Sequence, residues 1–128
     1  SRKDSLLQIY PTREMNTKHI LSAQCYSKNG KLLSSATNSY SKTHPLQKLF
    51  ACKAGLPAKQ YLHAEISAII KSRGQSIHAL HVSRYNKQGK MMNAMPCAIC
   101  CEAIKQYGIE HVFYTTNTGC IEQLDMEG

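Results

Sequence analysis

Apolar residues recur at helical spacing in two segments of the chain. Residues 61–73 carry four of them on one face, and Gly74 follows as a stop signal. Residues 96–107 form the second predicted helix, which Pro96 opens and Gly108 closes. Shorter helical segments, each followed by a proline, are expected over residues 4–10 and 46–54. The apolar positions of the first predicted helix are Leu62, Ile66, Ile69 and Ile70.

Runs rich in β-branched and aromatic residues predict five strands. The Asn29-Gly30 pair is typical of a hairpin turn between the first two. The turn at residues 117–119 indicates that the last strand returns antiparallel to its predecessor. The strands are expected over residues 18–26, 31–37, 77–85, 109–115 and 120–124. The resulting order, β-β-α-β-α-β-β, predicts an α/β fold in one domain over residues 1–128, with two helices against a central sheet of about five strands.

The composition is that of a globular protein, and the sequence predicts no membrane-spanning helix. The apolar fraction is 42%, and no segment approaches the ~20 consecutive apolar residues that a spanning helix needs. The apolar run after Ser1-Arg2-Lys3-Asp4 is too short for a signal peptide. We therefore expect a cytoplasmic protein without a membrane partner.

Positive charge is concentrated in one half of the chain. The formal net charge is +8, and residues 1–60 hold ten Lys and Arg against two acidic residues. Residues 61–128 hold six of each sign. Such an asymmetry favours a phosphate-bearing partner, although a solvated basic face would have the same composition.

Six cysteines in a short chain raise the question of disulfides. Three of them fall within residues 97–101, whereas a disulfide framework spreads its cysteines over loops. We expect free thiols, some of them metal ligands. Cys25, Cys52 and Cys120 are expected to be small buried side chains, and Cys101, about 100° round the helix from Cys100, a core thiol.

Cys97, Cys100 and His63 have the spacing of a catalytic metal site. Two cysteines three residues apart at a helix start share one face, where the positive end of the helix dipole lowers thiol pKa values. His63, at the start of the other predicted helix, adds an imidazole. Three protein ligands leave a fourth position of a Zn²⁺ ion open to water, which is typical of catalytic zinc.

Glu65 completes this pattern. Because it lies two residues from His63, it can approach a water molecule activated by the metal instead of binding the metal itself. Zinc lowers the pKa of such a water toward 7, and a carboxylate can accept its proton and deliver it to a base and a leaving amine.

The motifs His63-Ala64-Glu65 and Pro96-Cys97-Ala98-Ile99-Cys100 resemble the signature of the zinc-dependent nucleobase deaminases. Residues 61–66 and 42–45 are similar to the cytidine and deoxycytidylate deaminase branch, and the resemblance covers about residues 18–116. It implies a three-layer α/β/α sandwich with both zinc-bearing helices on one face. It also implies a Zn²⁺ cofactor, Glu65 as the catalytic residue and a homo-oligomer.

The resemblance further implies where a substrate binds. A polar residue after the second strand commonly contacts the sugar, which nominates Asn38, and the loop after it could meet a phosphate. The loop after the third strand commonly borders the pocket, which nominates Tyr85. The substrate-binding residues expected on this basis are Asn38, Ser39, Lys42, His44, Ala64 and Tyr85.

Two substrate classes remain open. A pyrimidine nucleotide or nucleoside, with deoxycytidylate (dCMP) converted to deoxyuridylate (dUMP), fits the motifs and the basic first half. A base in single-stranded DNA or RNA would use the same pocket, but the absence of Trp disfavours the stacking that such binding uses. A non-enzymatic zinc-stabilised module is disfavoured by Glu65. The antiparallel last strand is typical of free-nucleoside deaminases, in conflict with the similarity at residues 42–45.

The remaining histidines are not expected to bind metal. His78 and His81 lie three residues apart on a predicted strand, and therefore face opposite sides of the sheet. His19 and His111 are expected to be structural or exposed. We see no second His/Cys cluster of the kind that deoxycytidylate deaminases build on an insertion.

Overall fold

A computed structural model describes residues 20–58 and 61–125. The helical turn expected over residues 4–10 lies outside this range, as does His19. The elements, in chain order, are β1 (Ile20–Tyr26), β2 (Leu32–Thr37), α2 (Pro45–Lys53), α3 (Ala64–Lys71), β3 (Ala79–Tyr85), β4 (Met91–Met92), α4 (Ala98–Gln106), β5 (His111–Thr115) and β6 (Ile121–Gln123).

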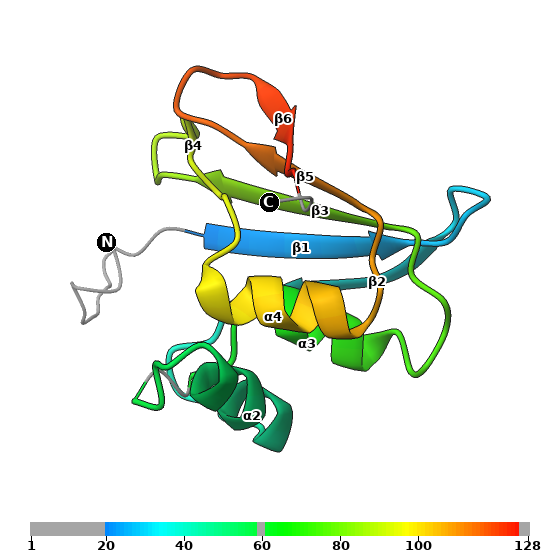
Figure 1. Ribbon diagram of the computed structural model, residues 1–128. Helices are drawn as coiled ribbons and strands as arrows, with labels where there is room; N and C mark the ends of the chain where they lie inside the picture. Colours follow the sequence, from blue (N-terminus) through cyan, green and yellow to red (C-terminus); the bar gives the residue numbers. More distant parts are fainter. Residues whose placement is uncertain (1–19, 59–60, 126–128) are drawn as a thin grey trace, which may run out of the picture.

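The strands form one mixed sheet in the order β2-β1-β3-β5-β6, with the two-residue β4 added beside β3. β3 and β5 are parallel, and the other pairs are antiparallel. The predicted α/β fold is thus confirmed, as is the antiparallel last strand. Figure 1 shows α2, α3 and α4 together on one side of the sheet. The described residues therefore supply the sheet and one helical layer, which includes both helices of the metal motifs.

The alternation of side chains along the strands explains which face the helices cover. In β1, Ala23 and Cys25 are buried, and in β3 the same is true of Leu80 and Val82. Their neighbours in sequence point to the opposite face of the sheet. The helical side of the core is formed by Phe50, Ile66, Ile69, Ile99, Cys100, Ala103 and Ile104.

The hairpin between β1 and β2 forms at the Asn29-Gly30 turn, as predicted. Gly30 has a φ of +83°, which an L side chain adopts only with strain, and its N–H donates to the carbonyl of Ser27 at 2.9 Å. The turn fixes the antiparallel register that pairs Ser22 with Thr37. The end of β2 and the residues after it are thereby placed beside β1.

Both helices of the metal motifs begin later than predicted. α3 begins at Ala64 because Tyr61 forms an isolated β-bridge with Thr43, and His63 keeps an extended backbone. α4 begins at Ala98, so Pro96 precedes the N-cap residue instead of occupying the first turn. The sheet differs slightly from the prediction. β3 begins at Ala79 instead of residue 77, and the short β4 is an additional strand.

All six cysteines are free thiols, as expected. Cys25 is buried, but the expectation of burial is wrong for Cys52 and Cys120, which are exposed at the end of α2 and in the turn before β6. Within the described residues, every helix falls short of the length and hydrophobicity that a membrane span requires.

Candidate active site

The N-cap positions of α3 and α4 hold two of the three predicted metal ligands. His63 caps α3 and Cys97 caps α4, both with an extended backbone and without a side-chain hydrogen bond to the helix. Their side chains therefore do not cap the helices and can bind a metal. The backbone of His63 is held by a hydrogen bond, since its N–H donates at 3.1 Å to Oε1 of the fully buried Gln47.

The three predicted ligands converge on one point. His63 Nδ1 lies 3.4 Å from Cys100 Sγ and 3.5 Å from Cys97 Sγ, and all three donor atoms lie within 4.8 Å of one another. Donors on one zinc ion sit at about 2.0–2.3 Å from the metal, which requires separations of this order. The imidazole and two sulfurs therefore fit a tetrahedral zinc ion with one open position.

The two thiols interact directly. A hydrogen bond from the Cys100 thiol lowers the pKa of Cys97 to about 3. Cys97 in turn raises the pKa of Cys100, and burial adds to this effect. The pair thus favours one thiolate in the absence of metal, and a divalent cation favours both thiolates.

Glu65 lies in the first turn of α3, adjacent to this donor set. Its residue is 3% exposed, and Oε1 has no hydrogen-bond partner among the described residues. Burial raises the pKa of the carboxyl, whereas the His63 ring and the Cys100 thiol act in the opposite direction. A buried carboxylate oxygen without a partner is costly unless something else binds there, so the site accommodates a further polar group.

The model of the family described as the cytidine and deoxycytidylate deaminase zinc-binding region matches residues 12–116. The chain belongs to this family. Searches of curated proteins and of solved structures give no match. The family is one of zinc-dependent deaminases, and the donor geometry positions His63, Cys97 and Cys100 to bind a metal ion.

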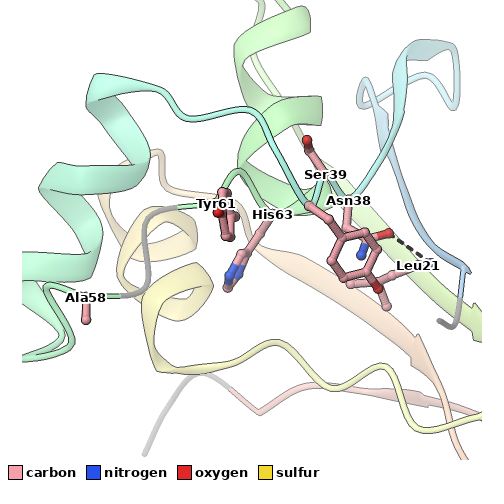
Figure 2. Close-up of a pocket in the computed structure, with 7 residues that line it drawn as sticks. Leu21, Asn38, Ser39, Ala58, Tyr61 and His63 are labelled. Atoms are coloured by element: carbon pink, nitrogen blue, oxygen red, sulfur yellow. Dashed lines mark hydrogen bonds between the residues drawn. The ribbon is translucent and has the colours of Figure 1, made fainter. Parts of the chain in front are cut away.

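Beside the zinc ligands of this deaminase lies a cavity of about 390 Å³, within the usual range for small-molecule sites. Figure 2 shows Asn38, Ser39, Tyr61 and His63 around it. Asn38 follows β2, as predicted, and is held to β1 because its Oδ1 accepts from the Leu21 N–H at 3.3 Å. The remaining lining residues are Leu21, Tyr40 and Ala58.

A second cavity of about 260 Å³ joins the first through Leu21, Asn38, Tyr40 and His63, and it reaches Cys97. Arg84 lines this cavity. Tyr85, the predicted residue, follows Arg84 in β3, and alternation turns it to the sheet face that carries His81, where it is 40% exposed. A role for Tyr85 in substrate binding stays a prediction.

Two other predicted substrate residues line a third cavity of about 370 Å³, which shares Asn38 and Ser39 with the first. Lys42 and His44 line it, together with Lys71 from the end of α3. His44 also caps α2, because its Nδ1 accepts from the Leu46 N–H at 3.0 Å. Ala64 is fully buried in the first turn of α3, next to His63.

Sequence reasoning missed several residues that line these cavities. Tyr40 lies inside the predicted substrate loop, and Tyr61 lies two residues before His63, so proximity to the motifs was the available signal. Asn93 and Met95 precede Pro96 and line the second cavity. For Arg84 the available signal was the alternation along β3, because Arg84 shares a strand face with the buried Leu80 and Val82 and Tyr85 does not.

Proposed function

We propose that this zinc-dependent deaminase hydrolyses the exocyclic amine of a pyrimidine nucleotide, and that deoxycytidylate is converted to deoxyuridylate with release of ammonia. The observation that carries the proposal is the buried Glu65 carboxylate, which has an oxygen without a described partner and lies beside three zinc-binding side chains. A purely structural zinc site has no need of such a group.

In this proposal Glu65 moves the protons of the reaction. Bound zinc supplies Lewis-acid activation of the attacking water. Glu65 accepts a proton from that water and delivers it to the ring nitrogen next to the amine-bearing carbon, while the water oxygen forms a bond to that carbon. Glu65 then transfers the second water proton to the amine, the carbon–nitrogen bond breaks, and ammonia leaves.

The arrangement of the cavities supports the choice of a nucleotide as substrate, because two adjoining cavities offer separate places for its parts. The base and sugar would occupy the cavity beside His63, with Asn38 as the polar contact. The adjoining basic cavity, lined by Lys42, Lys71 and His44, would hold the phosphate. We place Ser39 between the two subsites, since it lines both.

The experiment compares deamination of deoxycytidylate and deoxycytidine by the zinc-loaded protein. Lys42→Ala should lower kcat/KM for the nucleotide about tenfold, as expected for a lost charged contact, and leave the nucleoside rate unchanged. Lys53→Ala, at the exposed end of α2, is the matched control and should change neither. An equal loss for both substrates would show that Lys42 does not bind phosphate.

A base in a single-stranded polynucleotide is the second candidate. It is favoured by two aromatic rings that line the first cavity, Tyr40 and Tyr61, which are 49% and 56% exposed and could stack on neighbouring bases. Salt separates the candidates, because polynucleotide binding releases several counterions and weakens steeply as salt rises. Oligonucleotide deamination with such a salt dependence, at a higher kcat/KM than for the nucleotide, would favour this class.

A further inference from the structure

A second group of metal-binding side chains lies at the opposite end of the sheet from the zinc ligands. His78 precedes β3, and Glu110 and His111 stand where β5 begins. Figure 1 shows that β3 and β5 both begin at the end of the sheet away from the start of α4. β3 has seven residues, so the two groups are separated by about 20 Å along the strands.

The parallel pairing of β3 and β5 brings these residues together. The His111 N–H donates to the carbonyl of His78 at 3.3 Å, and the two imidazole rings have their centroids 4.7 Å apart. Glu110 Oε1 lies 4.0 Å from His111 Nε2. One donor atom from each of the three residues lies within 4.8 Å of the others, the same limit that the zinc ligands satisfy.

Two side chains of this group are exposed, so a metal ion in solution can reach them without a change in the fold. The Glu110 side chain is 73% exposed and that of His111 is 40% exposed. Donors on one tetrahedral ion are about 3.3 Å apart, so a small rotation of these side chains closes the remaining distance. Because the Glu110 side chain is largely exposed, this rotation costs little.

A neighbouring amide can orient one of the imidazoles. Nε2 of Gln123, in β6, lies 3.2 Å from His111 Nδ1. An amide can present its oxygen at the same place, where it would accept a hydrogen bond from Nδ1–H and leave Nε2, the nitrogen near Glu110, for a metal. Such an outer hydrogen bond is the usual companion of a metal-binding histidine.

We propose that His78, Glu110 and His111 form a second, surface binding site for a divalent transition-metal ion. Two imidazoles and one carboxylate are the donor set that Zn²⁺ and its first-row neighbours prefer over Mg²⁺ and Ca²⁺, which favour oxygen ligands alone. An exposed carboxylate and two imidazoles hold such an ion less tightly than two thiolates and an imidazole, so the site binds metal reversibly and more weakly than the active site.

The test uses the untagged protein that already holds its catalytic zinc. Titration with Zn²⁺, followed by calorimetry and by metal analysis after gel filtration, should show a second equivalent. His111→Ala should weaken this second binding at least tenfold and leave the first equivalent in place. His81→Ala is the matched control, since His81 lies on the same face of the sheet as His111 but is not one of the three converging donors, and it should bind two equivalents.

Two results would overturn the proposal. One is a wild-type protein that binds a single equivalent of zinc under these conditions. The other is a second equivalent that persists in His111→Ala and in Glu110→Gln, because the exposed thiols Cys52 or Cys120 would then be its ligands. The Glu110→Gln variant keeps the test valid if His111→Ala folds poorly, since Glu110 is exposed.

Discussion

The two ends of the parallel pair β3 and β5 gather metal-binding side chains in different ways. Near the carboxyl ends, His63 and Cys97 are N-cap residues, and the third ligand, Cys100, is fully buried in α4. At the amino ends, Glu110 and His111 come from the start of one strand and are partly exposed. The difference shows what helix starts contribute: they place donors from distant parts of the sequence against a buried core.

The surroundings of the two groups differ as well. The zinc ligands have a buried carboxylate, Glu65, and adjoining cavities beside them. Beside His78, Glu110 and His111 the neighbouring groups are another aromatic ring, Phe113, and the Gln123 amide. The buried carboxylate and the cavities lined by His63 and Cys97 therefore favour the first site as the place of the chemistry.

Removal of a buried zinc ligand should have the largest effect. Cys100→Ser is expected to abolish zinc binding at the active site, reduce ammonia release to background, and lower the Tm, because a metal held by both thiolates and His63 joins the start of α4 to the start of α3. Metal analysis, an ammonia assay and thermal unfolding measure the three effects. Cys101→Ser, next in sequence and only partly buried, is the control and should retain zinc and activity. Full zinc occupancy in Cys100→Ser would show that the ligand set is wrong.

Loss of the carboxylate should have a narrower effect. We expect Glu65→Gln to keep zinc and to lower kcat by a factor on the order of 10²–10⁴, the usual contribution of a general acid–base group, with little change in stability. Glu122→Gln, an exposed change on β6, should leave kcat as in the wild type. The assigned role of Glu65 is refuted by a variant that loses less than half of its activity, or that loses zinc in parallel.

Local patterns predicted most of the fold and the zinc site. The spacing of Cys97 and Cys100 on one turn, and the helical periodicity after His63, depend only on neighbours in sequence. The start of α3 lies later than predicted, because the bridge between Thr43 and Tyr61 is a contact across the fold that no local pattern shows.

What the sequence did not predict depends on strand register. The pairing of β3 with β1 sets Arg84 opposite Leu21, and both residues line the second cavity. The pairing of His78 with His111 was missed for the same reason: His78 was weighed against His81 on its own strand, whereas its partner lies across a parallel ladder. Residues that combine through sheet pairing need the register before their chemistry can be seen.

The smallest effect on activity should come from brief treatment with a chelator, and it sharpens the comparison between the two ends. Protein saturated with two equivalents of zinc is expected to lose one equivalent quickly to EDTA while its rate of ammonia release stays unchanged. The reason is that Glu110 and His111 are open to solvent, whereas thiolates bind zinc more tightly than a carboxylate and Cys100 is buried. Metal content and initial rate, measured on the same samples over time, check this. Activity that falls in proportion to the first metal lost would mean that the easily removed ion is the catalytic one, and the ranking of the two sites would be reversed.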